Sequence, residues 1–211
     1  MLQAIRNNPN ISILIIVVFH IVGLLGFSFE ASIPLFQQLV PMHLLLMAFL
    51  LFLNHKDWNT NFYIFLFSIF LLSFSVEAIG TNTGKIFGQY YYLSTLGYKV
   101  WNTPLLIGIN WLILVYSVGI TLHRYKIHAV LKSIIGALVL VGIDYYIEPV
   151  AIRFDYWTWT GMQVPLQNYI AWTICGFVFL LMFNYLKFEK SNSVANILLI
   201  VQTLFFIFLQ G

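Results

Sequence analysis

The chain has 211 residues, of which 61% are hydrophobic, 18% are aromatic and only 8% are charged, and its mean hydropathy is +0.89. Soluble domains carry about 25% charged residues, so this composition excludes an ordinary water-exposed surface and predicts a bundle in lipid. The net charge of +3 includes no basic run, which argues against a nucleic-acid partner. The single cysteine, Cys175, rules out a disulfide framework and a cysteine metal site.

Seven apolar runs of spanning length follow one another along the chain, separated by short polar connections. We therefore expect an all-α, polytopic transmembrane bundle that forms a single integral membrane domain over residues 1–211. The predicted spans are Ile11–Phe29, Leu35–Leu53, Phe62–Ile79, Pro104–Leu122, Val130–Tyr146, Gln167–Leu186 and Val194–Leu209.

The basic residues predict an orientation. If the N-terminus is cytoplasmic, seven basic residues face the inner side and three the outer side, as the positive-inside rule expects. The inner set is Arg6, Lys56, Arg124, Lys126, Lys132, Lys187 and Lys190, and the outer set is Lys85, Lys99 and Arg153. Five of the seven acidic residues then lie at the outer face, namely Glu30, Glu77, Asp144, Glu148 and Asp155. We expect a protein of the bacterial cytoplasmic membrane with its N-terminus inside.

Two outer connections are long and rich in aromatic residues. The stretch Glu77–Pro104 contains four glycines, four tyrosines and a tryptophan, and the stretch Asp144–Asn168 is similarly aromatic and polar. Long connections in a compact bundle usually cover or bind something. An aromatic belt at the membrane interface explains the Tyr and Trp content equally well, but it does not explain acidic residues within apolar runs.

Glu77 and Asp144 are those acidic residues, at or near the ends of the third and fifth runs. Ionised carboxylates are costly at such positions unless they are paired or face a wet cavity, so a functional role is the default reading. Glu148 lies four residues after Asp144 and shares its helix face if the helix persists, although Pro149 favours extended geometry at Glu148. Salt bridges to Lys85, Lys99 or Arg153 are the structural alternative.

Two sequence blocks resemble a known family. The first reads E-x-x-G-x-x-T-G followed by F-G-x-Y-x-Y over residues 77–92, and L-G, P-L and Trp111 come after it. The second reads D-x-x-x-E-P-V-A, then W-x-W, then V-P-L-x-N-x-x-x-W over residues 144–172. Together they resemble the membrane carotenoid biosynthesis family that contains the cofactor-independent carotenoid 1,2-hydratases of bacteria and haloarchaea.

The resemblance implies addition of water to the terminal double bond of an acyclic carotenoid, with the carotenoid, water and membrane lipid as partners and carotenoid-pathway enzymes as possible neighbours. Protonating this alkene gives a tertiary carbocation, so the site needs a neutral carboxylic acid, electron-rich surfaces and a placed water. Neither a metal nor an organic cofactor is required.

Residue roles follow from this chemistry as hypotheses. We expect Glu77 or Asp144 to donate the proton and the other to position or deprotonate water, with Glu148 as a third catalytic carboxyl group. The predicted substrate-binding residues are Tyr90, Tyr92, Trp157 and Trp159 around the cation, Asn168 and Asn110 orienting water or the carboxyl groups, and Trp111 and Thr83.

Three alternatives remain open at this stage. A lycopene-type cyclase protonates the same kind of end group but lets a neighbouring double bond capture the cation. A b-type haem electron carrier would use His20 and His43, which lie near the middle of the first two helices. A small transporter is the third, although no convincing internal repeat supports it.

Overall fold

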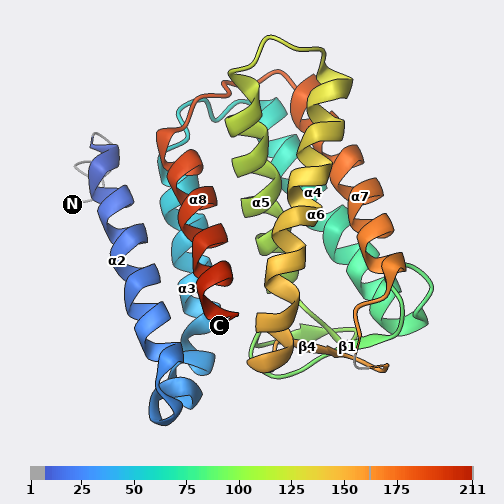
Figure 1. Ribbon diagram of the computed structural model, residues 1–211. Coiled ribbons are helices and arrows are strands. Elements are labelled where there is room, and N and C mark those ends of the chain that lie inside the picture. The colour runs from blue at the N-terminus through green and yellow to red at the C-terminus, as the bar shows by residue number, and fades with distance from the viewer. Residues whose placement is uncertain (1–7, 162, 211) are drawn as a thin grey trace.

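A computed structural model describes residues 8–161 and 163–210, and Arg6 therefore lies outside the described residues. Seven α-helices account for most of these residues, which confirms the all-α bundle (Figure 1). The helices are α2 (Pro9–Ser28), α3 (Ile33–Leu53), α4 (Thr60–Thr83), α5 (Leu106–His123), α6 (Ala129–Arg153), α7 (Leu166–Tyr185) and α8 (Ser193–Leu209), and a 3-10 turn, η1 (Glu30–Ser32), precedes α3. In the described part of the chain, six helices are long and apolar enough to cross a membrane, and α8 is a shorter apolar helix of 17 residues.

Helix α5 forms the centre of the bundle. It packs against α3, α4, α6, α7 and α8, and every residue from Trp111 to Ile120 is buried. On one side of it α2, α3 and α8 lie together, and on the other α4, α6 and α7 (Figure 1). A side chain that points inward from any of these helices therefore meets protein atoms.

Small residues bring α6 and α7 close together. A Cβ atom on Gly136 would lie 2.5 Å from Leu180 Cδ1, and one on Gly176 would lie 2.9 Å from Leu140 Cδ1. Close approach of this kind is the usual way in which helices associate within lipid, where the hydrophobic effect between helices is weak. It holds α6, which carries two of the predicted acids, firmly against α7.

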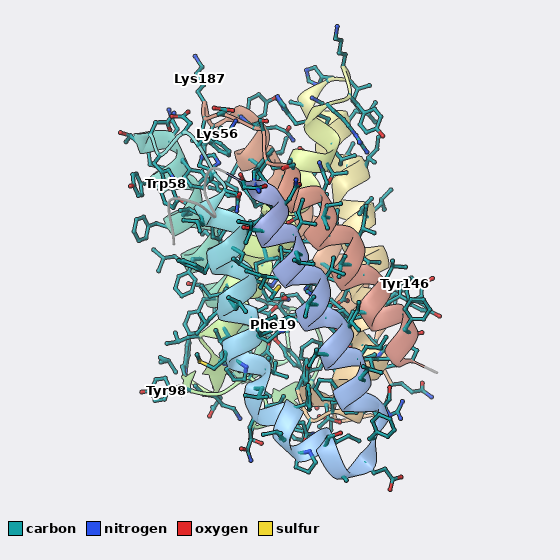
Figure 2. All side chains as sticks on the ribbon, turned by 90° about the vertical axis from the view of Figure 1, so that its left-hand side faces the viewer. Phe19, Lys56, Trp58, Tyr98, Tyr146 and Lys187 are labelled. Carbon is teal, nitrogen blue, oxygen red and sulfur yellow. The ribbon has the colours of Figure 1, made fainter. Side chains whose placement is uncertain are left out.

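Short strands close one end of the bundle. Strand β1 (Tyr90–Tyr92) pairs antiparallel with β4 (Trp157–Trp159), and β2 (Lys99–Val100) pairs antiparallel with β3 (Thr103–Pro104). Lys56 and Lys187 lie at the opposite end from Tyr98 (Figure 2). The two aromatic connections thus meet each other, while the basic connections occupy the other end.

Two helix ends differ from the prediction. Helix α6 continues to Arg153, seven residues beyond the predicted end at Tyr146, and α4 continues to Thr83 instead of ending at Ile79. The expectation that Pro149 draws Glu148 out of the helix was wrong, because Pro149 lies inside α6. Burial of the last turn through Val150, Ala151 and Phe154 stabilises the helix despite the hydrogen bond that the proline cannot donate.

Candidate active site

Glu77 accepts three hydrogen bonds in the protein interior. Its Oε2 accepts the hydroxyl groups of Tyr90 at 2.6 Å and Tyr92 at 2.8 Å, and its Oε1 accepts the indole N–H of Trp111 at 2.9 Å. The side chain is only 3% exposed. The donors come from β1 and α5, so Glu77 ties the connection to the centre of the bundle.

Glu148 accepts a second set of donors. Its Oε2 accepts the indole N–H groups of Trp157 at 3.0 Å and Trp159 at 2.7 Å. The amide of Asn168 on α7 lies 3.3 Å from the other carboxylate oxygen. Because α6 persists past Pro149, Glu148 remains on the helix face from which it reaches the strand β4.

Asp144 lies one helical turn before Glu148 and shares a partner with it. The Asn168 amide donates to Asp144 Oδ2 at 2.8 Å and so bridges the two carboxyl groups. Asp144 is fully buried, and its Oδ1 has no hydrogen-bond partner among the described residues. That oxygen is thus the one carboxyl atom of the cluster that is both buried and free.

The β1–β4 pair joins the two carboxylate groups. Tyr90 is opposite Trp159 and Tyr92 is opposite Trp157, with ring centroids 5.1 Å and 6.0 Å apart. Alternate residues of a strand face opposite sides, so these four rings point inward while Tyr91 is 52% exposed. The four aromatic side chains form a continuous surface between Glu77 on α4 and Glu148 on α6.

Only neutral groups donate to these carboxylates in the described structure: tyrosine hydroxyls, indole N–H groups and one amide. Two of the three basic residues given as alternative partners bind elsewhere, since Lys99 donates to the Tyr92 carbonyl and Arg153 to the Leu209 carbonyl. Burial, and secondly the nearby Glu77, raises the pKa of Tyr90 and Tyr92 well above 10. Both tyrosines therefore keep their protons and act as donors.

Of the other predicted substrate-binding residues, one joins the carboxyl cluster, one lines a neighbouring cavity and one lies apart from both. Trp111 joins the cluster and stacks on Trp172 with centroids 4.0 Å apart. Asn110 is half-buried and lines a neighbouring cavity. Thr83 is not brought into the cluster, because it is exposed and its hydroxyl donates to the Ile79 carbonyl at 2.6 Å.

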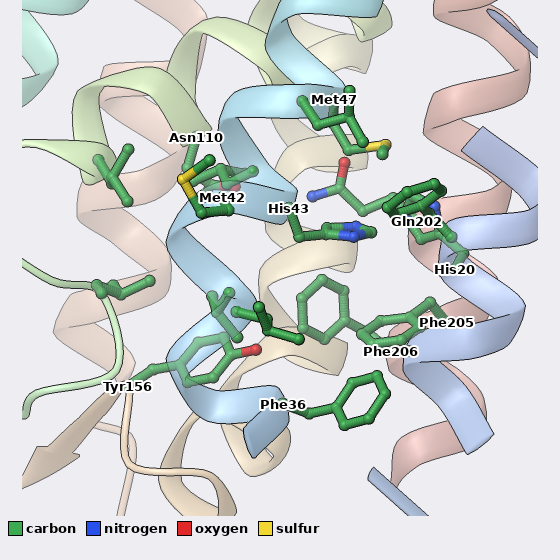
Figure 3. A pocket seen from close by; sticks show the side chains of 18 of the residues that line it. His20, Phe36, Met42, His43, Met47, Asn110, Tyr156, Gln202, Phe205 and Phe206 are labelled. Atoms are coloured by element: carbon green, nitrogen blue, oxygen red, sulfur yellow. The ribbon is translucent and has the colours of Figure 1, made fainter. Parts of the chain in front are cut away.

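An apolar cavity of about 430 Å³ adjoins the cluster (Figure 3). Its walls come from α2, α3, α5, α6 and α8, and it shares Trp157 with the donors of Glu148. Gln202 on α8 lies in this wall and was missed by the sequence analysis. A lone amide in an apolar run was the signal available for finding it.

His20 and His43 meet in the wall of the same cavity. Their rings are arranged edge to face with centroids 4.8 Å apart, and His20 Nδ1 lies 2.8 Å from the Ile16 carbonyl oxygen. The rings thus fill the space that a porphyrin held between them would need. In the described residues, no group of three or more His, Cys, Asp or Glu side chains is arranged to hold a metal ion.

Six helices able to cross a bilayer and a buried cluster of carboxyl groups at one end define an integral membrane protein with a candidate acid–base site. The chain belongs to a known family of such proteins: the family model described as "Carotenoid biosynthesis protein" matches residues 36–211. This match confirms the family predicted from the two sequence blocks. It gives the protein a role in carotenoid biosynthesis.

One curated relative is a bisanhydrobacterioruberin hydratase of Haloarcula japonica. It is 26% identical to this chain over 141 residues, which cover 60% of this chain and 46% of the relative. The chain thus spans about half the length of the curated relative that it matches. No solved structure gives a significant match.

Proposed function

We propose that the protein is a carotenoid hydratase that adds water to the terminal carbon–carbon double bond of an acyclic carotenoid end group. The observation that carries the proposal is the set of three buried carboxyl groups, Glu77, Asp144 and Glu148, which receive only neutral donors and lie beside four aromatic rings. The hydratase of Haloarcula japonica supports the same class of reaction.

Asp144 is the proton donor in this proposal. The carboxylate of Glu77 accepts three hydrogen bonds, and that of Glu148 also accepts three. Asp144 accepts one, and its buried Oδ1 has no partner in the described structure. A protonated Oδ1 can point its O–H group toward an alkene, whereas the other two carboxyl groups already serve as acceptors.

The proposed reaction has two steps. The Asp144 proton passes to the less substituted carbon of the double bond, and the electron pair of the π bond forms the new C–H bond, which leaves a tertiary cation. The rings of Tyr90, Tyr92, Trp157 and Trp159 stabilise this cation through their negative faces. A water molecule then attacks the cation and gives a proton back to the Asp144 carboxylate, so the net change is the addition of one water.

Glu77 and Glu148 support these steps as fixed negative groups. Preorganised charges and dipoles act most strongly in a buried site, where little solvent competes with them. Glu148 shares Asn168 with Asp144, and its Oε1 has only the longer of the two amide contacts, at 3.3 Å. We assign Glu148 to holding the attacking water, and Glu77 to holding the tyrosines against the cation.

The test is expression in a bacterium that accumulates acyclic carotenoids, followed by chromatography with mass detection. Hydration gives a more polar pigment that is heavier by one water and keeps its chromophore, whereas a lycopene-type cyclase gives an isomer of unchanged mass. We expect Asp144→Asn to abolish the product.

Asp155→Asn is the matched control for Asp144→Asn. Asp155 is exposed at the same end of the bundle with φ +58°, a conformation that Asn also tolerates. Its variant is expected to retain the activity. Full activity in Asp144→Asn would refute the assigned donor, and the absence of any hydrated pigment from several acyclic substrates would refute the proposed reaction.

We also propose that the N-terminus faces the cytoplasm and that the β1–β4 end of the bundle faces the outer side of a bacterial cytoplasmic membrane. The support is the position of Lys56 and Lys187 at the end of the bundle opposite Tyr98 (Figure 2), together with the predicted excess of basic residues on the inner side. Single cysteines at Tyr98 and Lys187 in a Cys175→Ala background test this. Only the Tyr98 position should react with an impermeant thiol reagent in intact cells.

A further inference from the structure

The apolar cavity of about 430 Å³ reaches from the lipid-facing surface toward the carboxyl cluster. Its wall includes Met42 on α3 and Phe19 on α2, which are 66% and 46% exposed on the outside of the bundle. Trp157 and Asn110 also line it. Its volume lies within the range of about 300–1,000 Å³ that is typical of small-molecule sites. A ligand dissolved in the membrane can therefore enter sideways and extend toward Glu148.

Besides Asn110, three polar side chains lie in this apolar wall. His20, His43 and Gln202 come from three different helices and surround the same part of the cavity (Figure 3). His20 uses Nδ1 for the Ile16 carbonyl, whereas no described hydrogen bond uses the His43 ring or the Gln202 amide. The Gln202 side chain is only 7% exposed. Because these polar atoms face the cavity and have no described protein partner, a ligand in the cavity can supply one.

We propose that the cavity binds an acyclic isoprenoid chain bearing an oxygen substituent, and that Gln202 and His43 bind this oxygen. The proposal rests on the proposed function in one respect, because it assigns the reacting end of the chain to the Trp157 end of the cavity. The apolar walls suit the hydrocarbon chain. The chemistry of the two polar groups suits a hydroxyl group, because an amide and a neutral imidazole each offer both a donor and an acceptor.

The position of the polar group sets which part of the chain it recognises. Gln202 on α8 and His43 on α3 lie in one part of the cavity wall, whereas Trp157 of β4, which donates to Glu148, lines the part that adjoins the cluster. An oxygen bound by Gln202 is therefore held by other elements than those that surround the reacting double bond. The site accordingly selects chains already oxygenated away from the reacting end, and a reaction that installs this oxygen must precede it.

Equilibrium binding tests the inference without requiring turnover. The full-length protein in lipid nanodiscs is titrated with two acyclic polyenes of equal length, a hydrocarbon and its hydroxylated analogue, and quenching of tryptophan fluorescence is followed. We expect the hydroxylated polyene to bind about tenfold more tightly, as one to two added hydrogen bonds imply. Gln202→Leu and His43→Phe should each remove most of this preference and leave binding of the hydrocarbon unchanged.

Two further variants separate the possible outcomes. Thr203→Val is the matched control on α8, since the Thr203 hydroxyl donates to the Leu199 carbonyl at 2.7 Å, and it should keep the preference. Gly23→Leu fills the cavity and should weaken both polyenes alike. Thermal unfolding of each variant, compared with the unchanged chain, identifies a loss of binding that is caused by misfolding.

Equal binding of the two polyenes by the unchanged protein would overturn the inference, and so would a preference that survives in Gln202→Leu. Either result would mean that the polar group holds only water. Failure of the proposed function is distinguishable from this, because it would leave the binding preference intact and give no hydrated pigment. Failure of the inference alone would leave hydration intact without any effect of Gln202 on substrate choice.

Discussion

Removal of the Tyr92 hydroxyl group tests whether the neutral donors stabilise the buried carboxylate of Glu77. In Tyr92→Phe the ring keeps its contacts with Tyr90 and Trp157, whose centroids lie 5.5 Å and 6.0 Å away. The change therefore removes one hydrogen bond of 2.8 Å to Glu77 and almost no packing. Hydrogen bonds to charged groups contribute about 1.5–3 kcal/mol. In a chain of this length, each kcal/mol changes the melting temperature by about 2–4 °C, so we expect a decrease of about 3–12 °C.

Tyr91→Phe is the matched control because Tyr91 lies between the two tyrosines on β1 but is 52% exposed. Tyr91→Phe should have the same melting temperature as the unchanged protein. Unfolding can be followed with a thiol-reactive fluorescent dye, since the chain has one cysteine and Cys175 is half-buried in α7. Equal melting temperatures for Tyr92→Phe and Tyr91→Phe would refute the argument that the hydroxyl group stabilises Glu77.

A double-mutant cycle identifies the partner. If the Tyr92 hydroxyl acts through Glu77, its removal should destabilise a Glu77→Gln background much less than it destabilises the unchanged protein. Additive effects of the two substitutions would show that Tyr92 stabilises the fold through some other contact. This outcome would remove the physical basis for treating Glu77 and the β1 tyrosines as one unit.

Three other predictions concern separate parts of the molecule. Gly136→Val should destabilise the protein by about 1–3 kcal/mol in the same dye assay, because its Cβ atom would lie 2.5 Å from Leu180 Cδ1. Burial lowers the pKa of His55 below 6.5, so as the pH falls the imidazole is protonated in the unfolded chain before it is protonated in the folded protein. The stability of the folded protein therefore falls as the pH drops below 6.5. His55→Gln should reduce this dependence of the melting temperature on acid pH. Trp159→Phe removes one hydrogen bond to the Glu148 carboxylate and should reduce conversion of the carotenoid roughly tenfold or more, whereas Trp101→Phe, at an exposed site, should not.

Hydropathy located all seven helices because burial of the backbone in lipid requires long apolar runs. It placed the end of α6 too early, since Glu148 and Pro149 reduce the local hydropathy although the carboxylate is satisfied by two indole groups. The compensation comes from β4, beyond the end of the helix. Hydropathy is evaluated for one segment at a time, so it does not include a hydrogen-bond partner that comes from another segment in the tertiary structure.

The sequence predicted which residues form the candidate site, but it did not predict which of them contact one another. Acids within apolar runs and aromatic residues spaced two apart were visible in the sequence, and the structure brings most of them together. The pairing of Tyr90 with Trp159 depends on the meeting of two distant connections, which no local pattern specifies. Thr83 matched the first block but donates its hydroxyl to the Ile79 carbonyl of its own helix instead, and Gln202 lies outside both blocks. The catalytic roles assigned to these residues remain predictions.

The charge of the hydrogen-bond donors decides how readily a buried carboxyl group can take up and release a proton. A lysine or arginine beside a buried carboxylate favours the charged form and opposes uptake of a proton. Tyrosine, tryptophan and asparagine donors hold a carboxyl group in place without adding a compensating charge, so proton transfer leaves no unpaired cation in the apolar interior. Each described hydrogen bond to Glu77, Asp144 and Glu148 is of this neutral kind. A lysine placed at Asn168, whose amide donates to Asp144, should therefore abolish hydration. Unchanged conversion in Asn168→Lys would show that protonation of Asp144 is not part of the reaction.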